Sequence, residues 1–259
     1  MLKFITADFY YYIHQAFWPF LRIITLLSLA PLFSDKGINS KIKIGLSISI
    51  TWLIVPTLPS VEVDIISFNG LWLGGLQLFI GMAMALTMQL IFVAVRHAGE
   101  LIGLQMGLSF ATFYDHSGGQ NMPVVARILN LLAILLFLSF NGHLLLIEAL
   151  AVSFDILPLQ LLSLSGEGIM MLVKFSDIIF LAGIKLALPV VSLLLCINLS
   201  LGLVNRLIPP LSIFVVGFPL SLSIGMLMLS MLLYSFAPFF EQLLTEIFAS
   251  LSSLLLHLA

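Results

Sequence analysis

Long apolar runs separated by short polar segments fill almost the whole sequence, and this pattern limits the possible folds more than any other feature. A helix needs about 20 apolar residues to cross the roughly 30 Å hydrocarbon layer of a membrane. Six runs come close to that length: Tyr10–Phe33, Ile42–Leu58, Phe68–Val95, Val124–Val152, Ile178–Val204 and Leu211–Phe236. The sequence therefore predicts an all-α, multi-span helical membrane protein with kinked helical hairpins.

A seventh apolar segment, Phe239–Leu258, differs from the six because it contains Glu241 and Glu246. We expect it to form a separate amphipathic helix that lies at the membrane interface or packs on protein. The segment "NRLIPPLS", which begins at Asn205, predicts a tight hairpin between the last two spans because prolines cannot continue a helix.

Composition supports the membrane assignment. Charged residues make up 8% of the chain and hydrophobic residues 61%, whereas a soluble domain carries roughly 25% charged residues. The net charge of −2 gives no electrostatic reason to expect a nucleic-acid partner. Basic residues fall on one set of connections and most acidic residues on the other, and the positive-inside rule places the basic set in the cytoplasm.

The sequence has none of the common catalytic patterns. It lacks a P-loop, a nucleophile elbow, paired carboxylates and metal-ligand spacing, so we expect neither an enzyme nor a bound cofactor or metal. The one cysteine, Cys196, lies in an apolar run and is predicted to fill space in the core.

One segment departs from the apolar pattern: "GLQMGLSFATFYDHSGGQNMP", from Gly103 to Pro123. Gly99, Gly103 and Gly107 recur every fourth residue, so they share a helix face that lets another backbone approach closely. The Gly-, Ser- and Met-rich stretch that follows cannot continue a lipid-facing helix, and irregular backbone at membrane depth must be buried in protein or line a cavity. It is therefore either a soft constriction that can be displaced or a plain solvent-exposed connection.

Polar side chains inside the apolar runs are further candidates, because a charged group in hydrocarbon costs about 2.5–3.5 kcal/mol. Glu100 follows Arg96 by four residues, which allows an ion pair near a helix end. Asn141 and His143 indicate hydrogen bonds between helices. A proton relay is the alternative, but residues two positions apart point to different faces of a helix.

The span Ile178–Val204 holds a second set of polar groups. Lys185 lies about a third of the way along it, and we expect its long side chain to reach the interface. Asn198 and Arg206 follow near the far end of this helix.

Four blocks together resemble the FliR family of flagellar type III export-gate proteins. They are "GELIGLQMGLSFATFYDHSGGQNMPVVARILN", "FLSFNGHLLLIEALAVSFDILP", "LALPVVSLLLCINLSLGLVNRLIPPLSIFVVGFPLSLSIG" and "FWPFLRIITLLSLAPLF", and the resemblance covers roughly Phe17 to Glu246. It implies one export-gate domain, 1–259, in which about 1–157 are similar to a FliP protomer. The remaining residues, about 158–259, form a hairpin similar to a FliQ protomer.

The resemblance also implies partners and a site. FliR proteins join FliP and FliQ in a helical hetero-oligomer of the inner membrane at the flagellar basal body, work with FlhB-type and FlhA-type proteins, and pass unfolded flagellar proteins. The segment described above corresponds to the plug of the closed gate, which gives these plug-loop candidates: Gln105, Met106, Gly107, Ser109, Phe110, Phe113 and Met122. The family often has Asp-Pro where this chain has Asp115-His116.

Other functions stay open on the sequence alone. The homologous gate subunit of a virulence injectisome, SctT, shares the overall pattern. A small-solute secondary transporter would need a charged or cation-coordinating site between broken helices, for which only Lys185 and the Asn141–Glu148 region are available. A purely structural scaffold is the third alternative.

Overall fold

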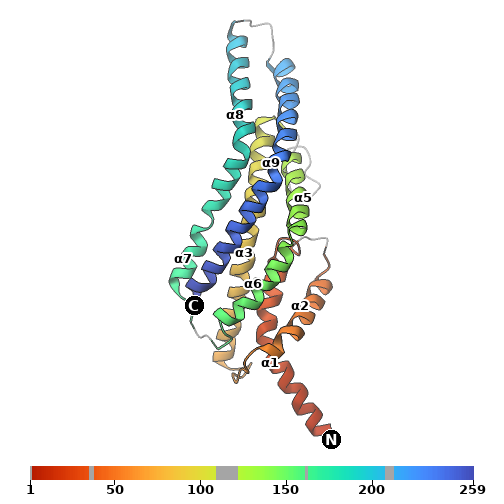
Figure 1. The fold of residues 1–259 in the computed structure, drawn as a ribbon, viewed down its shortest axis with the longest axis vertical. Helices are drawn as coiled ribbons and strands as arrows, with labels where there is room; N and C mark the ends of the chain where they lie inside the picture. The colour runs from red at the N-terminus through yellow and green to blue at the C-terminus, as the bar shows by residue number, and fades with distance from the viewer. Residues whose placement is uncertain (1, 35–37, 109–121, 161–162, 208–212) are drawn as a thin grey trace. The chain divides into compact units, whose positions relative to one another are not determined.

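The computed structural model describes residues 2–34, 38–108, 122–160, 163–207 and 213–259. Regular structure in these residues is entirely helical, and the all-α prediction is confirmed (Figure 1). The elements are α1 (Leu2–Leu29), α2 (Ser40–Ile54), the 3-10 helix η1 (Val55–Thr57), α3 (Phe68–Gln105), α5 (Val124–Ser139), α6 (Gly142–Ile156), α7 (Gly166–Lys174), α8 (Asp177–Leu207) and α9 (Ile213–Leu258).

Three described segments are long and apolar enough to cross a membrane: Phe68–Gln105, Gly166–Val204 and Gly217–Leu258. A fourth is added if α5 and α6 together form one span. The multi-span prediction is confirmed, but fewer segments qualify than the six expected. The predicted span Ile42–Leu58 fails because α2 has only 15 residues, and α1 contains the polar side chains of His14, Gln15 and Arg22 within its apolar run.

Two helix boundaries differ from the sequence-based expectation. The predicted span Val124–Val152 is divided at Asn141, which adopts the left-handed conformation with φ 56° and starts α6. In contrast, the expected break before Phe239–Leu258 is absent, because α9 runs through Pro238 as one helix of 46 residues. A proline removes one backbone hydrogen bond, and here Phe236 and Phe240, on either side of Pro238, are both buried. The expected hairpin at "LIPPL" lies outside the described residues.

The chain forms two compact units, each assembled from several chain segments. Unit 1 contains Met1–Gln89, Asn141–Phe175 and Ile247–Ala259, and unit 2 contains Leu90–Phe140 and Ser176–Glu246. The division near Pro158 into FliP-like and FliQ-like parts concerns similarity to other chains, and it stays a prediction.

The core of unit 1 contains a buried cation. Arg22 on α1 is fully buried, and its guanidinium donates hydrogen bonds to Gln77 on α3 and to α6. Nε donates to Gln77 Oε1 (2.8 Å), Nη1 to the Ser153 carbonyl and hydroxyl oxygens (2.8 and 3.0 Å), and Nη2 to the Leu157 carbonyl oxygen (2.8 Å). The ring of Phe154 lies 4.3 Å from the Arg22 Cζ atom. One side chain thus ties three helices together through neutral acceptors.

Close backbone contact accompanies this polar cluster. A Cβ atom added at Gly81 on α3 would lie 3.1 Å from Thr25 Cβ and 3.2 Å from the Leu26 nitrogen of α1, and would meet the Arg22 carbonyl oxygen still more closely. At the far end of α1, the Gln89 side chain donates to the Leu29 carbonyl oxygen at 2.6 Å. Side-chain size at Gly81 therefore limits how close α1 and α3 can lie.

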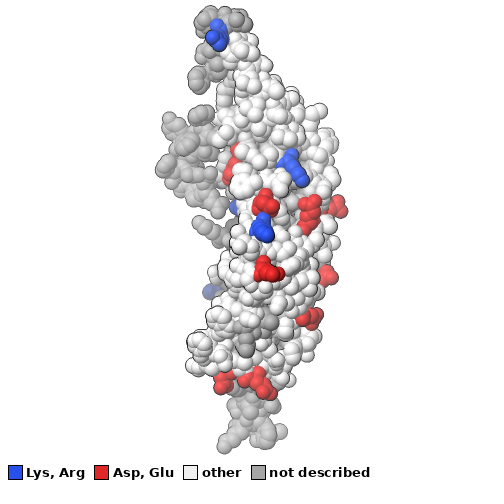
Figure 2. Space-filling model, turned by 90° about the vertical axis from the view of Figure 1, so that its left-hand side faces the viewer, with Lys and Arg blue, Asp and Glu red and all other residues white. Residues whose placement is uncertain are grey.

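The surface matches the composition. On the face shown in Figure 2, charged side chains are few, and most of the surface drawn in white is uncharged. Many large apolar side chains are exposed, among them Trp52 (74%), Leu131 (55%) and Tyr234 (89%). Exposed apolar area of this extent is expected of a chain that meets lipid or partner subunits rather than water.

We expect Arg22→Ala to lower the free energy of unfolding by about 2–5 kcal/mol, because it leaves a cavity and strands buried acceptors on Gln77, Ser153 and Leu157. The matched control is Arg127→Ala, since Arg127 is exposed on α5 and such a change is usually within about 0.5 kcal/mol. The measurement is the thermal unfolding midpoint of the detergent-purified chain. Equal midpoints for the two variants would show that the buried cation is not a structural requirement.

Candidate functional site

The segment Gly103–Pro123 begins at a defined helix end. Gly107 has φ +78°, a left-handed conformation that side chains disfavour. The Gly107 amide donates to the Leu104 carbonyl oxygen (3.1 Å) and the Leu108 amide to the Gly103 carbonyl oxygen (3.0 Å). This pair of bonds is the Schellman motif, which satisfies the last carbonyl groups of a helix. α3 therefore stops at Gln105 for a local reason: glycine occupies the position that must turn left.

Two residues at this helix end are held by α9 within unit 2. Met106 is fully buried, and its side chain lies against Gly225, where an added Cβ atom would be 2.6 Å from Met106 Cγ and 2.9 Å from Sδ. An added Cβ atom at Gly107 would be 3.1 Å from the Phe218 ring. Only glycine at position 225 leaves room for Met106 in this place.

The other end of the segment returns to the same helix. A Cβ atom added at Gly103 would lie 3.3 Å from Pro123 Cβ. One turn earlier, a Cβ atom at Gly99 would be 2.8 Å from the Ala126 nitrogen and would meet the Ala126 Cα atom still more closely. The glycine face of α3 thus lies directly against the start of α5, and the two ends of the segment are held side by side.

The remaining plug-loop candidates are less defined. Gln105 and Met122 are half-buried next to the two anchors. Ser109, Phe110 and Phe113, like His116, lie outside the described residues.

The polar candidates do not gather into one site. Glu100 is exposed, and in the described part of the chain no ion pair joins it to Arg96. Its neighbour His97 packs edge-on against the Phe180 ring of α8, with ring centroids 5.6 Å apart. Asn141 is exposed at the start of α6. His143 is half-buried, and its Nδ1 atom has no hydrogen-bond partner.

On α8, Lys185 is exposed and lines a cavity of about 270 Å³ with Met228, Met231 and other residues of α8 and α9. Asn198 accepts a hydrogen bond from the Ser221 hydroxyl at 3.0 Å, which joins α8 to α9. Arg206 is exposed near the end of α8. These three residues are spread along the helix and form no common pocket.

Arg22 is the residue that the sequence analysis missed. It is the one arginine or lysine inside the predicted span Tyr10–Phe33, and an ionisable residue in such a position is by default a functional or structural centre. Two further donors at this core have no acceptor: Trp18 Nε1 and Gln77 Nε2. The single arginine within the apolar run "FLRIITLL" was the sequence feature that could have identified this centre.

The described residues contain no group of three or more His, Cys, Asp or Glu side chains placed to hold a metal. Both described ends of the segment Gly103–Pro123 pack closely within unit 2. Gly103 lies against Pro123, and the Met106 side chain fills the space beside Gly225.

Comparison with known proteins gives the family. The model of the bacterial export proteins, family 1, matches residues 13–247. The flagellar biosynthetic protein FliR of Pectobacterium carotovorum subsp. carotovorum is 50% identical over 259 residues, which cover 100% of this chain and 99% of the relative.

More distant relatives carry the same name. The FliR protein of Escherichia coli (strain K12) is 47% identical over 258 residues, or 100% of this chain and 99% of its own. That of Bacillus subtilis (strain 168) is 29% identical over 216 residues, or 81% and 82% of the two chains. A family match over most of the chain and full-length relatives at this identity leave one conclusion: the chain belongs to the bacterial export proteins of family 1, the family of the flagellar biosynthetic FliR proteins.

Proposed function

We propose that this chain is a core subunit of the flagellar type III export gate in the bacterial inner membrane, at the flagellar basal body. It joins FliP and FliQ homologues to build the pore through which unfolded flagellar proteins pass, and FlhB-type and FlhA-type proteins are its further partners. The segment Gly103–Pro123 is the plug of this pore. Family membership supports the export role, and the flagellar names of its relatives favour the flagellar gate over the injectisome gate.

The observation that carries the plug assignment is the anchoring of both ends of the segment. Gly103 lies against Pro123, and Met106 is locked against Gly225. A loop with both ends fixed can move its middle aside without detaching, which a reversible seal requires.

The chemistry of the segment suits a seal that must pass many sequences. Asp115 is its one carboxylate, and Lys and Arg are absent from Gly103 to Pro123. Strong ionic contacts would hold a passing chain or select among sequences, and their absence avoids both. Methionine is flexible and polarisable, so it can fill irregular gaps around different side chains.

An idle gate and an active gate then differ by a small rearrangement. In the idle state, Met106 stays in its buried position and the loop blocks ions. An arriving polypeptide displaces the loop, and the Schellman end of α3 at Gly107 is the point at which the backbone can turn. When the polypeptide has passed, the loop returns to its closed position, because both of its ends have stayed in place.

Deletion of Ser109–Gly118 in cells that express the whole gate should raise ion leakage across the inner membrane, because the seal is removed while both anchors stay. Conductance is measured by the growth defect and by depolarisation of the membrane. The control is the same deletion in cells without the FliP homologue, where no pore assembles and no leakage is expected. Unchanged conductance in the complete gate would rule out a sealing role for this loop.

Gly225→Ala should produce a partial leak, since the added methyl group occupies the space of the Met106 side chain. Overpacking by one methyl costs about 1–3 kcal/mol, so we expect the open fraction to rise about five-fold or more, still below the leak of the loop deletion. Gly202→Ala on α8 is the matched control, because nothing lies within 4 Å of its added Cβ atom. Similar leakage from the two alanine variants would contradict the Met106 anchor.

Co-purification tests the assembly part of the proposal. A tagged chain expressed with FliP and FliQ homologues should elute with both, since its exposed apolar faces require cover. Expressed alone, it should be poorly stable, with a lower unfolding midpoint in detergent than in the complex. A stable, monodisperse chain that ignores both homologues would argue against a role in the gate.

A further inference from the structure

Helix α2 exposes large apolar side chains and buries two hydroxyl residues. Its buried residues are Ser47, Ile50 and Thr51, while Ile48 and Trp52 are 53% and 74% exposed. The two hydroxyl groups donate to carbonyl oxygens of their own helix at 2.7 Å, so these donors need no hydrogen-bond acceptor from another helix or from water. A helix at a water-facing surface buries its apolar stripe instead. The outer face of α2 is therefore built to meet hydrocarbon.

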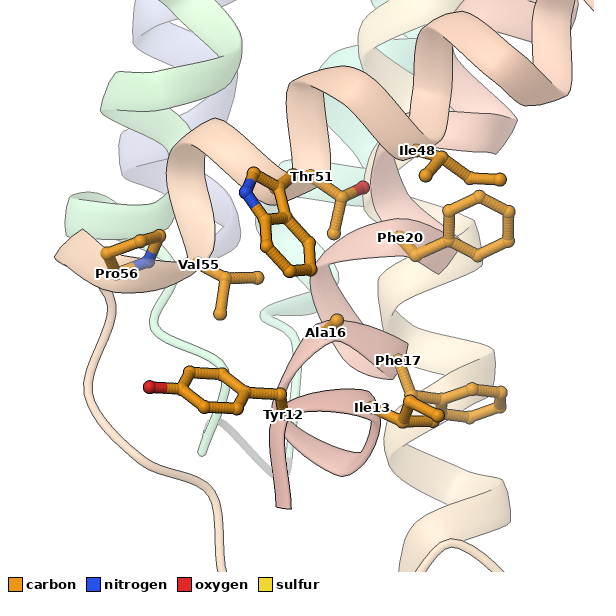
Figure 3. A pocket seen from close by; sticks show the side chains of 10 residues that line it. Tyr12, Ile13, Ala16, Phe17, Phe20, Ile48, Thr51, Val55 and Pro56 are labelled. Carbon is orange, nitrogen blue, oxygen red and sulfur yellow. The ribbon is translucent and has the colours of Figure 1, made fainter. Parts of the chain in front are cut away.

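A groove lies along this face, between α2 and α1 of unit 1. Its volume is about 770 Å³, within the roughly 300–1,000 Å³ range of binding pockets for small molecules. In Figure 3, aromatic and aliphatic side chains from both helices surround it. The lining residues are Tyr12, Ile13, Ala16, Phe17, Phe20, Ile48, Thr51, Trp52, Val55 and Pro56.

The lining disfavours a polar ligand. The hydroxyl of Thr51 is already bonded to the Ser47 carbonyl oxygen, and apart from the phenol hydroxyl of Tyr12 and the indole N–H of Trp52 the other lining side chains are hydrocarbon. A sugar, nucleotide or peptide backbone would lose its hydrogen bonds to water here without replacement, which is costly. An extended hydrocarbon chain loses nothing.

A cationic group stands on the same helix face as the groove. Lys41, Ile48 and Trp52 are spaced by seven and four residues, which places them in one stripe. The eleven helical steps from Lys41 to Trp52 span about 16 Å at about 1.5 Å per step. One leaflet of the hydrocarbon core is about 15 Å deep, half of roughly 30 Å. The stripe thus has the length and polarity of one phospholipid.

The charged end of the stripe also suits a phosphate group. Lys41 is exposed in the first turn of α2, where the helix dipole favours negative charge. The Asn39 side chain caps the helix by accepting from the Lys41 amide at 3.1 Å. Lys43, two residues on, points to the opposite side of the helix and is half-buried.

We propose that the groove between α1 and α2 binds one acyl chain of an anionic phospholipid, with the phosphate of that lipid at Lys41. A protein helix is the other apolar occupant to consider. Such a helix would have to supply an acidic group next to Lys41 and apolar side chains next to Trp52. An anionic phospholipid has both a negatively charged phosphate and an apolar acyl chain in one molecule. The proposal concerns unit 1 and holds whether or not the Gly103–Pro123 segment seals a pore.

The test replaces Trp52 by the photoreactive amino acid p-benzoylphenylalanine, in cells that express the complete gate and grow on radioactive phosphate. After irradiation, the chain is purified under denaturing conditions and examined for label. We expect label on a band at the size of the chain itself. The same photoreactive residue in place of Leu53, which is 75% exposed but turned away from the stripe, reports on the surrounding lipid and should label less.

Charge variants examine the head-group assignment. With the photoreactive residue at position 52, Lys41→Gln should lower the label about five-fold, the effect of one lysine near an anionic surface. Lys43→Gln should leave it unchanged. The proposal is overturned by an adduct shifted to the size of a second protein, by label at position 52 no greater than at 53, by independence from Lys41, or by no adduct at all.

Discussion

The hydrogen bonds of the Arg22 guanidinium are the constraint on which unit 1 depends. A buried cation without a carboxylate partner must be solvated by neutral oxygen atoms, and Gln77, Ser153 and Leu157 provide them from two other helices. Because these acceptors belong to α3 and α6, the position of α1 is determined by where the acceptors meet. The shape of the groove between α1 and α2 depends on these hydrogen bonds as well, because α2 packs on α1, the helix that Arg22 holds in place.

Glycine has the corresponding role in unit 2. At Gly99 and Gly225 a neighbouring residue occupies the volume that a side chain would need, and at Gly103 Pro123 leaves little room for one. Helices therefore approach at backbone distance, and Met106 packs against Gly225. Close approach without polar bonds is the packing mode available to helices in an apolar medium. The hydrogen bonds of Arg22 therefore organise unit 1. The ends of the Gly103–Pro123 segment are instead held by close packing at glycine residues, which have no side chains.

The exposed apolar faces indicate the environment in which these two arrangements are stable. A chain with Trp52 and Tyr234 largely exposed is stable only in lipid or within an assembly, which accords with membership in an export-protein family. The proposed pore and the proposed lipid site use different parts of this surface. The pore segment avoids ionic contacts so that it does not select among passing sequences, whereas the lipid site combines an apolar groove with one lysine.

The sequence by itself determined the all-α class, the membrane environment and the family, because long apolar runs and the family's sequence blocks are properties of the chain alone. It ended the third span at Val95 and placed Gly107 on a helix face, whereas α3 continues to Gln105 and Gly107 turns left just beyond it. It predicted Asn141 as a polar group but not as the break between α5 and α6, and it predicted a separate helix at Phe239–Leu258, whereas α9 runs continuously from Ile213 to Leu258. The burial of Arg22, the Met106–Gly225 contact and the groove at Trp52 were decided only by the tertiary structure. Each depends on atoms brought together from distant parts of the chain, and no local pattern records which distant residue will supply the missing acceptor or leave the necessary space.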